Sequence, residues 1–438
     1  MKERFFELAA QLSRELHANE VLLCNFAGER SDFVRFNRAR VRQAGSVEQR
    51  SFALRLVRDK RQASATVEIS GGAEDFGLLR QSLGGLRDAL GGLPEDPWLS
   101  YNETPRSTDS VRRGALPVAE DVVAQAIGAA EGHDLAGFYA AGTLCRGFAN
   151  SLGQRNWHEV DSFNFDWSLH GAQGRAAKAS YAGTNWIGTV LEQKIHSAAG
   201  QLALLEMPDR AIAPSEYRAY LAPRAMEELA GLLCWGGFSA RSRATKQSPL
   251  LRMQGGQALS PRITLLENTA QGVAPGFQAD GFVKPPRVAL IEGGRLGEAL
   301  VSPRSAKEFG LETNAANGGE SPESLDLAPG TLEERNVLAA LERGLYASNL
   351  WYLNYSDRAA GRITGMTRFA TFWVQGGRIA APVGAMRFDD SVYRLLGENL
   401  LDLTREREML LDPSTYGGRS SASAHLPGAL LSALRFTL

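Results

Sequence analysis

The sequence has few of the residues that usually cross-link a small fold or anchor it in a bilayer. Its 438 residues contain only three cysteines, Cys24, Cys145 and Cys234, and these lie far apart. This spacing implies no disulfide framework. No run approaches the ~18–20 apolar residues that cross a membrane. The amino terminus also lacks the apolar core and cleavage site of a signal peptide. We therefore expect a cytoplasmic protein with no membrane contact.

An excess of charge of one sign is also missing. The chain has 48 basic and 49 acidic residues, a formal net charge of -1, which favours neither nucleic acid nor an anionic surface as a partner. Hydrophobic residues make up 44% of the chain, which is enough for buried cores. At about 100–200 residues per domain, the length predicts two to four domains.

The first hundred residues have the pattern of a small α+β unit. Apolar residues recur at helical spacing over residues 2–17, and residues 75–90 predict a second helix. Between them, strand-like runs alternate with a period of two. Turns are predicted at Asn37-Arg38 and at Ala44-Gly45, where such a meander would reverse.

The same order of elements recurs downstream at a spacing of roughly 115 residues. A helix is predicted over residues 118–131, strand-like runs follow, and a second helix is predicted over residues 186–204. We therefore predict two similar helix–β-meander–helix units, at 1–100 and at 110–212. Chance similarity remains the alternative, because strands between helices are common.

From Pro214 onward the sequence is richer in glycine, proline and short β-type runs. Helices are predicted only at residues 223–234, 332–344 and 391–405. This pattern predicts a β-rich C-terminal domain over 214–438 with a few helices, which would hold the candidate cleft. The fold class expected for the whole chain is α+β.

Several long strings in the second half are distinctive, and one more lies in the middle unit. They cover residues 302–320, 348–358, 362–374, 387–391, 416–420 and 434–438, with residues 157–167 in the middle unit. With these strings the chain resembles the TldD/PmbA family, from about residue 20 to the end and most strongly from Ser302 on. The resemblance implies a metallopeptidase complex, in which a zinc-bearing TldD-like subunit and a zinc-free TldE-like subunit degrade or mature unfolded peptides.

The zinc motif of the active branch, His-Glu-x-x-x-His on a helix with a later cysteine, is not intact here. The matching helix is residues 223–234, where the two histidine positions hold Met226 and Gly231, and Glu227 is retained. A thioether is a poor zinc ligand and glycine offers none. The resemblance therefore places the chain in the TldE-like (PmbA-like) or a TldD-related subgroup. We expect Glu227 to be a solvated helix residue.

A count of possible ligands leads to the same expectation. From residue 214 onward the chain has one cysteine, Cys234, and one histidine, His425, too few for three nitrogen or sulfur ligands. His158-Glu159 has no second histidine at helical spacing, so a structural role is expected. We predict no catalytic residue, no metal and no cofactor in this chain, with zinc on a partner subunit.

A glycine-punctuated, aromatic-rich stretch in the C-terminal domain carries many polar side chains. Such groups are costly to bury unless they bond each other or a ligand. They would form either an internal network or the lining of a peptide-binding cleft. The candidate cleft residues are Asn354, Asp357, Arg358, Arg362, Thr364 and Arg368.

Three functions are consistent with this sequence. The first is the TldE-like subunit of a heterodimer with a zinc-bearing TldD-like chain, inactive alone, that acts on unfolded peptides. The second is a homodimeric peptide-binding protein without catalysis. The third is a hydrolase that uses a non-zinc site in the polar stretch. None of the three requires nucleic acid.

Overall fold

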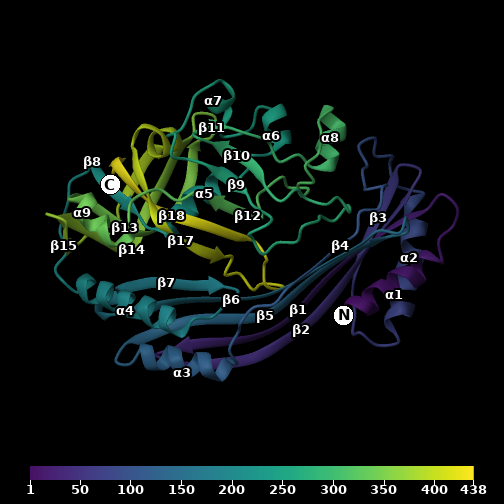
Figure 1. The fold of residues 1–438 in the computed structure, drawn as a ribbon, viewed down its shortest axis with the longest axis horizontal. Helices are drawn as coiled ribbons and strands as arrows, with labels where there is room; N and C mark the ends of the chain where they lie inside the picture. The colour runs from purple at the N-terminus through teal and green to yellow at the C-terminus, as the bar shows by residue number, and fades with distance from the viewer. Residues whose placement is uncertain (438) are drawn as a thin grey trace.

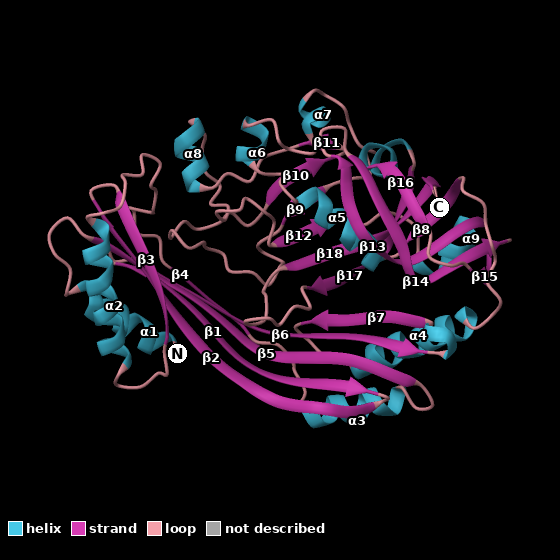
Figure 2. Cartoon of the chain, turned by 180° about the vertical axis from the view of Figure 1, so that it is seen from behind, coloured by secondary structure: helices cyan, strands magenta, loops and turns pink. Residues whose placement is uncertain are grey.

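The computed structural model describes residues 1–437 and contains two β-sheets with few helices (Figure 1). The α+β class expected from the sequence is confirmed. One sheet belongs to the first half of the chain, and the other to the second half (Figure 2). None of the described helices is long and apolar enough to cross a membrane.

The first sheet has seven strands in the order β3-β2-β1-β5-β6-β4, with β7 also paired to β6. All neighbours are antiparallel except β4, which runs parallel to β6. The strands are β1 Val21–Asn37, β2 Arg40–Arg58, β3 Arg61–Glu68, β4 Thr108–Arg112, β5 Asp134–Asn150, β6 Arg155–His170 and β7 Ala176–Gly183.

Four helices cover this sheet in two pairs, at opposite ends of its long strands (Figures 1 and 2). At one end, apolar residues of α1 and α2 pack on β1, β2 and β5. At the other end, α3 and α4 cover β5, β6 and β7. The helices are α1 Lys2–Ser13, α2 Asp75–Leu90, α3 Ala119–Ala129 and α4 Gly188–Leu205.

The two repeated units form one continuous sheet. β1 and β5 are both 17 residues long and begin 113 residues apart, at Val21 and Asp134. They pair antiparallel, with Arg30 opposite Thr143 at the centre of the repeat. The repeated order is therefore present, and a twofold pseudosymmetry relates the units through the β1–β5 pair. The three domain ranges drawn from the sequence stay a prediction.

Two turn predictions in the first unit had different outcomes. β1 and β2 are joined at Arg38-Ala39, both with positive φ, as a two-residue hairpin requires. The turn predicted at Ala44-Gly45 is wrong, because both residues lie inside β2. Gly45 pairs with Phe33, and a Cβ added there would lie 3.0 Å from the Phe33 ring. The glycine therefore makes room for a cross-strand aromatic ring and does not form a turn.

The second sheet has eleven strands, in the order β11-β10-β9-β12-β18-β8-β13-β14-β15, with β16 paired to β14 and β17 to β18. α5, Pro223–Cys234, packs against β13 and β18 and supplies part of the core. The strands are β8 Glu216–Leu221, β9 Leu265–Glu267, β10 Val288–Glu292, β11 Arg295–Leu296, β12 Ser324–Leu327, β13 Arg343–Asp357, β14 Arg362–Gln375, β15 Arg378–Pro382, β16 Arg387–Ser391, β17 Leu400–Leu411 and β18 Ser423–Arg435.

Only short helical segments accompany this sheet besides α5. They are α6 Ala240–Ala244, α7 Leu251–Gln254, α8 Pro303–Phe309, the 3-10 turn Glu334–Asn336, α9 Val337–Leu341 and the π-helical turn Arg394–Glu398. The helix predicted over residues 391–405 is confirmed only in its first half, by the π-helical turn Arg394–Glu398. From Leu400 on it is wrong, because β17 begins there and pairs with β18. The helix predicted over residues 332–344 ends at Leu341, and β13 begins at Arg343. In both places strand pairing overrides local helical spacing.

One buried arginine joins the two sheets at the centre of the repeat. Arg419 follows β17 in the chain and is 7% exposed. Its guanidinium donates to the carbonyl and hydroxyl oxygens of Ser162, at 2.7 and 2.8 Å, and to the carbonyl of Gly142 at 3.2 Å. Its backbone N–H donates to Glu29 at 2.9 Å. The C-terminal domain is thus bonded to β1, β5 and β6 together.

Candidate functional site

The helix expected to match the zinc motif, α5, begins at the boundary between the two sheets. Pro223 occupies its first turn, where a missing N–H costs nothing. Its buried face includes Met226, which is 1% exposed within the hydrophobic core. The Met226 thioether is therefore a core side chain. The next residue, Glu227, is only partly buried.

An arginine bridges two carboxylates beside this helix. Arg224 Nη2 lies 2.6 Å from Asp166 Oδ1, and Nη1 of the same guanidinium bonds Glu227. Lys178 Nζ approaches the same Asp166 oxygen at 3.7 Å. Because Asp166 and Lys178 belong to β6 and β7, this cluster joins α5 to the first sheet. Glu227 is less solvated than expected, because its side chain is only 28% exposed and is paired with Arg224.

Burial and neighbouring charge set the protonation of this cluster. Burial raises the pKa of Glu227, and the adjacent Arg224 guanidinium opposes that rise. For Arg224, burial lowers the pKa, but Glu227 and Asp166 outweigh it and the net shift is upward. The guanidinium therefore stays charged and supplies positive charge next to the one retained motif residue.

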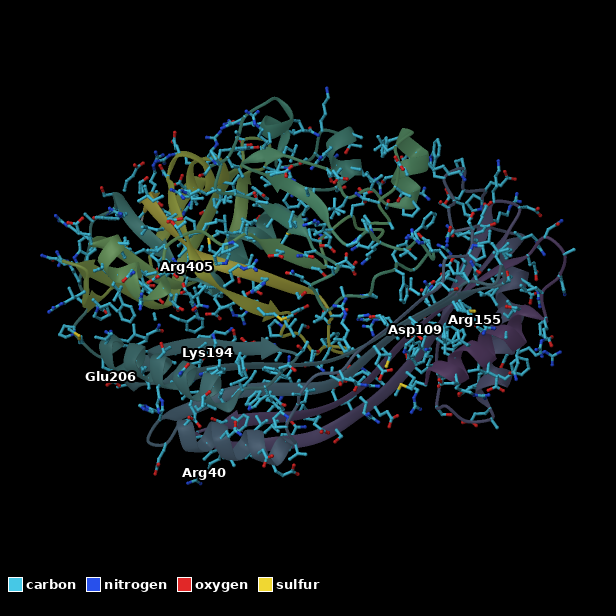
Figure 3. All side chains as sticks on the ribbon, viewed as in Figure 1. Arg40, Asp109, Arg155, Lys194, Glu206 and Arg405 are labelled. Carbon is cyan, nitrogen blue, oxygen red and sulfur yellow. The ribbon has the colours of Figure 1, made fainter. Side chains whose placement is uncertain are left out.

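A cavity of about 400 Å³ lies next to the cluster, between α4 and the second sheet. Lys194 of α4 (Figure 3) pairs across it with Glu408 of β17, with 2.8 Å between Nζ and Oε2. Burial, and then the charge of Glu408, raise the pKa of Glu334. Tyr220 and Tyr346 also line the cavity. Its lining combines charged groups of both signs with two aromatic rings.

The side chains at the zinc-motif positions do not fit a zinc site. Met226 packs in the core, Gly231 has no side chain and Glu227 is bound by an arginine. Burial raises the pKa of the Cys234 thiol to about 12, so the thiol is protonated at neutral pH. His425 lies on β18 beside Arg407 and Asp326, and burial lowers its pKa. Within residues 1–437, no three His, Cys, Asp or Glu side chains are grouped as metal ligands would be.

Three of the six candidate cleft residues lie at the tip of the β13–β14 hairpin. Asp357 Oδ2 accepts a hydrogen bond from Arg362 Nη2 at 2.9 Å, at the surface. Arg358 donates to the carbonyls of Gln247, at 3.0 Å, and Trp235, and its guanidinium lies 5.0 Å from the centre of the Trp235 ring. These contacts are an internal network that ties the hairpin to the end of α5.

The other three lie further along the hairpin. Asn354 is exposed and pairs across the strands with Thr364. Arg368 is also exposed and stacks on Trp351, with 4.0 Å from the guanidinium carbon to the ring centre. None of the six lines the cavity beside α5, although Arg362 lines a surface hollow of about 820 Å³ on the second sheet. Their role in binding a peptide stays a prediction.

Replacing Arg358 with alanine should lower the free energy of unfolding by about 1–2 kcal/mol, because two carbonyl partners and the packing on Trp235 are lost together. Urea denaturation followed by tryptophan fluorescence measures this change. Arg362→Ala is the matched control, since its pair with Asp357 is exposed. Equal losses in the two variants would show that the Arg358 contacts do not stabilise the hairpin.

Sequence patterns alone did not reveal the charged residues beside α5. Asp166 lies between Phe165 and Trp167, which are buried against α3 and α4, so strand alternation turns its carboxylate to the opposite face. This alternation could have identified Asp166 from the sequence, since a carboxylate between buried aromatic residues of a strand lies on the polar face of the sheet. Nothing in the sequence indicated that Arg224 would meet it.

The fold defines an α+β protein built of two β-sheets with few helices. Residues 214–437 match the family model described as the PmbA/TldA metallopeptidase C-terminal domain. This segment is more than half of the chain, and the chain belongs to the TldD/PmbA family. The resemblance seen in the sequence is confirmed.

Solved structures share this fold over almost the whole chain. TldE from Thermococcus kodakarensis has a TM-score of 0.81 at 15% identity, covering 99% of this chain and 100% of that one. A putative modulator of a DNA gyrase from Thermotoga maritima has a TM-score of 0.76 at 16% identity, covering 99% of both chains. A putative modulator of DNA gyrase from Bacteroides thetaiotaomicron has a TM-score of 0.77 at 14% identity, covering 100% of this chain and 98% of that one. A search of curated proteins gave no match.

Proposed function

We propose that this chain is the zinc-free, TldE-like subunit of a cytoplasmic metallopeptidase complex. Its partner would be a TldD-like chain that carries the zinc ion, and the substrate would be an unfolded peptide. The observation that carries the proposal is the bridge from Arg224 to Asp166 and Glu227. This bridge places the Arg224 guanidinium beside Glu227, the glutamate expected to remain from the zinc motif. A zinc-bearing chain would need metal ligands at this place.

The cavity beside α5 supports a role in holding peptide. It lies between the two sheets and is lined by Lys194, Glu334, Glu408 and two tyrosines. Polar groups of both signs can bond the carbonyls and N–H groups of an extended chain, whatever its sequence. No residue of this chain is assigned to bond cleavage, which the proposal leaves to the partner subunit.

The pure chain should not cleave an unfolded, fluorescently labelled peptide, whereas its mixture with a zinc-bearing homologue should. Co-purification from cells that express both chains tests the association, and loss of cleavage after chelation tests the metal. Cleavage by the pure chain that chelation abolishes would overturn the proposal. Binding of peptide without any partner-dependent cleavage would instead support a homodimeric peptide-binding protein.

A further inference from the structure

The internal repeat leaves one strand edge of the first sheet open, and its counterpart is filled. In the second unit, β4 pairs in parallel with residues 156–160 of β6. The two units are offset by 113 residues, since β1 begins at Val21 and β5 at Asp134. Residues 156–160 of β6 therefore correspond to residues 43–47 of β2. The strand pairings agree with this offset, because Ala44 pairs with Val34 in the first unit and Trp157 pairs with Gly147 in the second. No segment of residues 1–437 pairs with that part of β2 on the side away from β1.

The two edges also differ in burial. Asn156, Trp157, His158 and Val160 are all buried. On β2, residues 40–44 and Ser46 are exposed, although β2 runs as a regular strand through them. β3 begins to pair only at Ser51. Residues 40–48 of β2, called the open edge below, therefore present free backbone donors and acceptors at alternate positions.

The charge at the hairpin end of this edge is positive, although the whole chain is nearly neutral; at its other end, Glu48 is exposed and paired with Arg50. Arg35, Arg38, Arg40 and Arg42 lie on the β1–β2 hairpin, and all four are exposed. None of the ion pairs found within residues 1–437 involves them. Figure 3 shows Arg40 at the outer margin of the sheet, beside α3. Val41, 43% exposed, adds an apolar side chain at the same place.

We propose that the open edge is a docking site for an extended, acidic polypeptide segment. The segment would add a strand to β2, parallel to it as β4 is to β6, and its carboxylates would face Arg38, Arg40 and Arg42. A second copy of this chain would bring the same arginines against each other. A nucleic-acid duplex would leave the strand's donors and acceptors unpaired and Val41 uncovered. β1, β5 and β6 lie between this edge and β7, so the inference does not depend on the proposed peptidase role.

Fluorescence anisotropy with the full chain tests the proposal. The probe is a fluorescein-labelled peptide of about ten residues that alternates glutamate and valine, a length that matches the open edge at one strand residue per position. Saturable binding is expected in low salt. A peptide N-methylated at alternate residues should not bind, because it cannot complete the edge hydrogen bonds. A peptide with lysine in place of glutamate should not bind either.

Charge reversal in the protein provides the decisive comparison. The triple variant R38E/R40E/R42E should bind the glutamate peptide at least about tenfold more weakly and should now bind the lysine peptide. The matched control R287E/R295E/R378E changes the same number of exposed arginines on the other sheet and should bind like the parent chain. Circular dichroism melting checks that both variants fold.

Several results would overturn the proposal. The first is that the N-methylated peptide binds as tightly as the unmodified glutamate peptide, and the second is that R38E/R40E/R42E binds the glutamate peptide as tightly as the parent chain does. The third is that a DNA duplex binds more tightly than the glutamate peptide. The fourth is that the parent chain is a dimer in sedimentation analysis and R38E/R40E/R42E is not. The first result would show that binding does not depend on strand addition, and the second that it does not depend on the arginines. The last two would assign the edge to nucleic acid or to a second copy of this chain.

Discussion

Replacing Arg419 with alanine should lower the free energy of unfolding by about 3–5 kcal/mol, one of the two largest effects expected for any single change in this chain. The guanidinium is buried and donates to oxygens of Ser162, Gly142 and Ser31. Alanine would leave these acceptors without a donor at the centre of the first sheet. Urea denaturation followed by tryptophan fluorescence measures the loss.

Two further variants make this expectation specific. Arg419→Lys keeps the charge but has a single nitrogen, which cannot reach all three partners, so an intermediate loss is expected. Arg378→Ala removes an exposed arginine and should change stability by less than about 0.5 kcal/mol. A loss below about 1 kcal/mol in Arg419→Ala would show that the two sheets are held together without this side chain.

Replacing Arg224 with alanine should have a comparable effect of about 3–5 kcal/mol at neutral pH, because two partly buried carboxylates lose their shared cation. The effect should depend on pH. Burial raises the folded-state pKa of Glu227 above its unfolded value, so this group destabilises the fold as pH rises through that window. Without Arg224 the pKa rises further, so acidification should partly restore the variant.

The measurement is a pair of urea denaturation series for the parent chain and Arg224→Ala, at neutral pH and at about pH 5. The stability difference should narrow at the lower pH as Glu227 takes up a proton. In the double variant Arg224→Ala/Glu227→Gln, the stability difference from the parent chain should depend less on pH than in Arg224→Ala. A difference between parent and Arg224→Ala that is the same at both pH values would contradict the role given to this carboxylate.

The local patterns in the sequence determined much of the secondary structure. α2 and α5 have the predicted bounds, because amphipathic spacing and flanking glycine or proline act over a few residues. The order of elements also exposed the repeat. The failures, at Ala44-Gly45 and over residues 400–405, lie where a cross-strand partner decides the conformation.

The candidate site could be predicted only in part. That Met226 and Gly231 cannot serve as zinc ligands was visible, because ligand chemistry is a property of residue type. The contacts of Arg224 with Asp166 were not, since 58 residues separate them and neither lies in a motif. The six hairpin residues were chosen for their polarity, but they bond within the hairpin or lie at its surface, and none lines the cavity beside α5.

By itself, the sequence determined the family and the α+β class, because these depend on residue identity and short-range spacing. The tertiary structure alone decided that the two repeats share one sheet, that Arg419 and Arg224 join it to the C-terminal domain, and that one edge of β2 stays open. Strand pairing and buried charge pairs depend on which distant segments meet, and local sequence does not encode that choice.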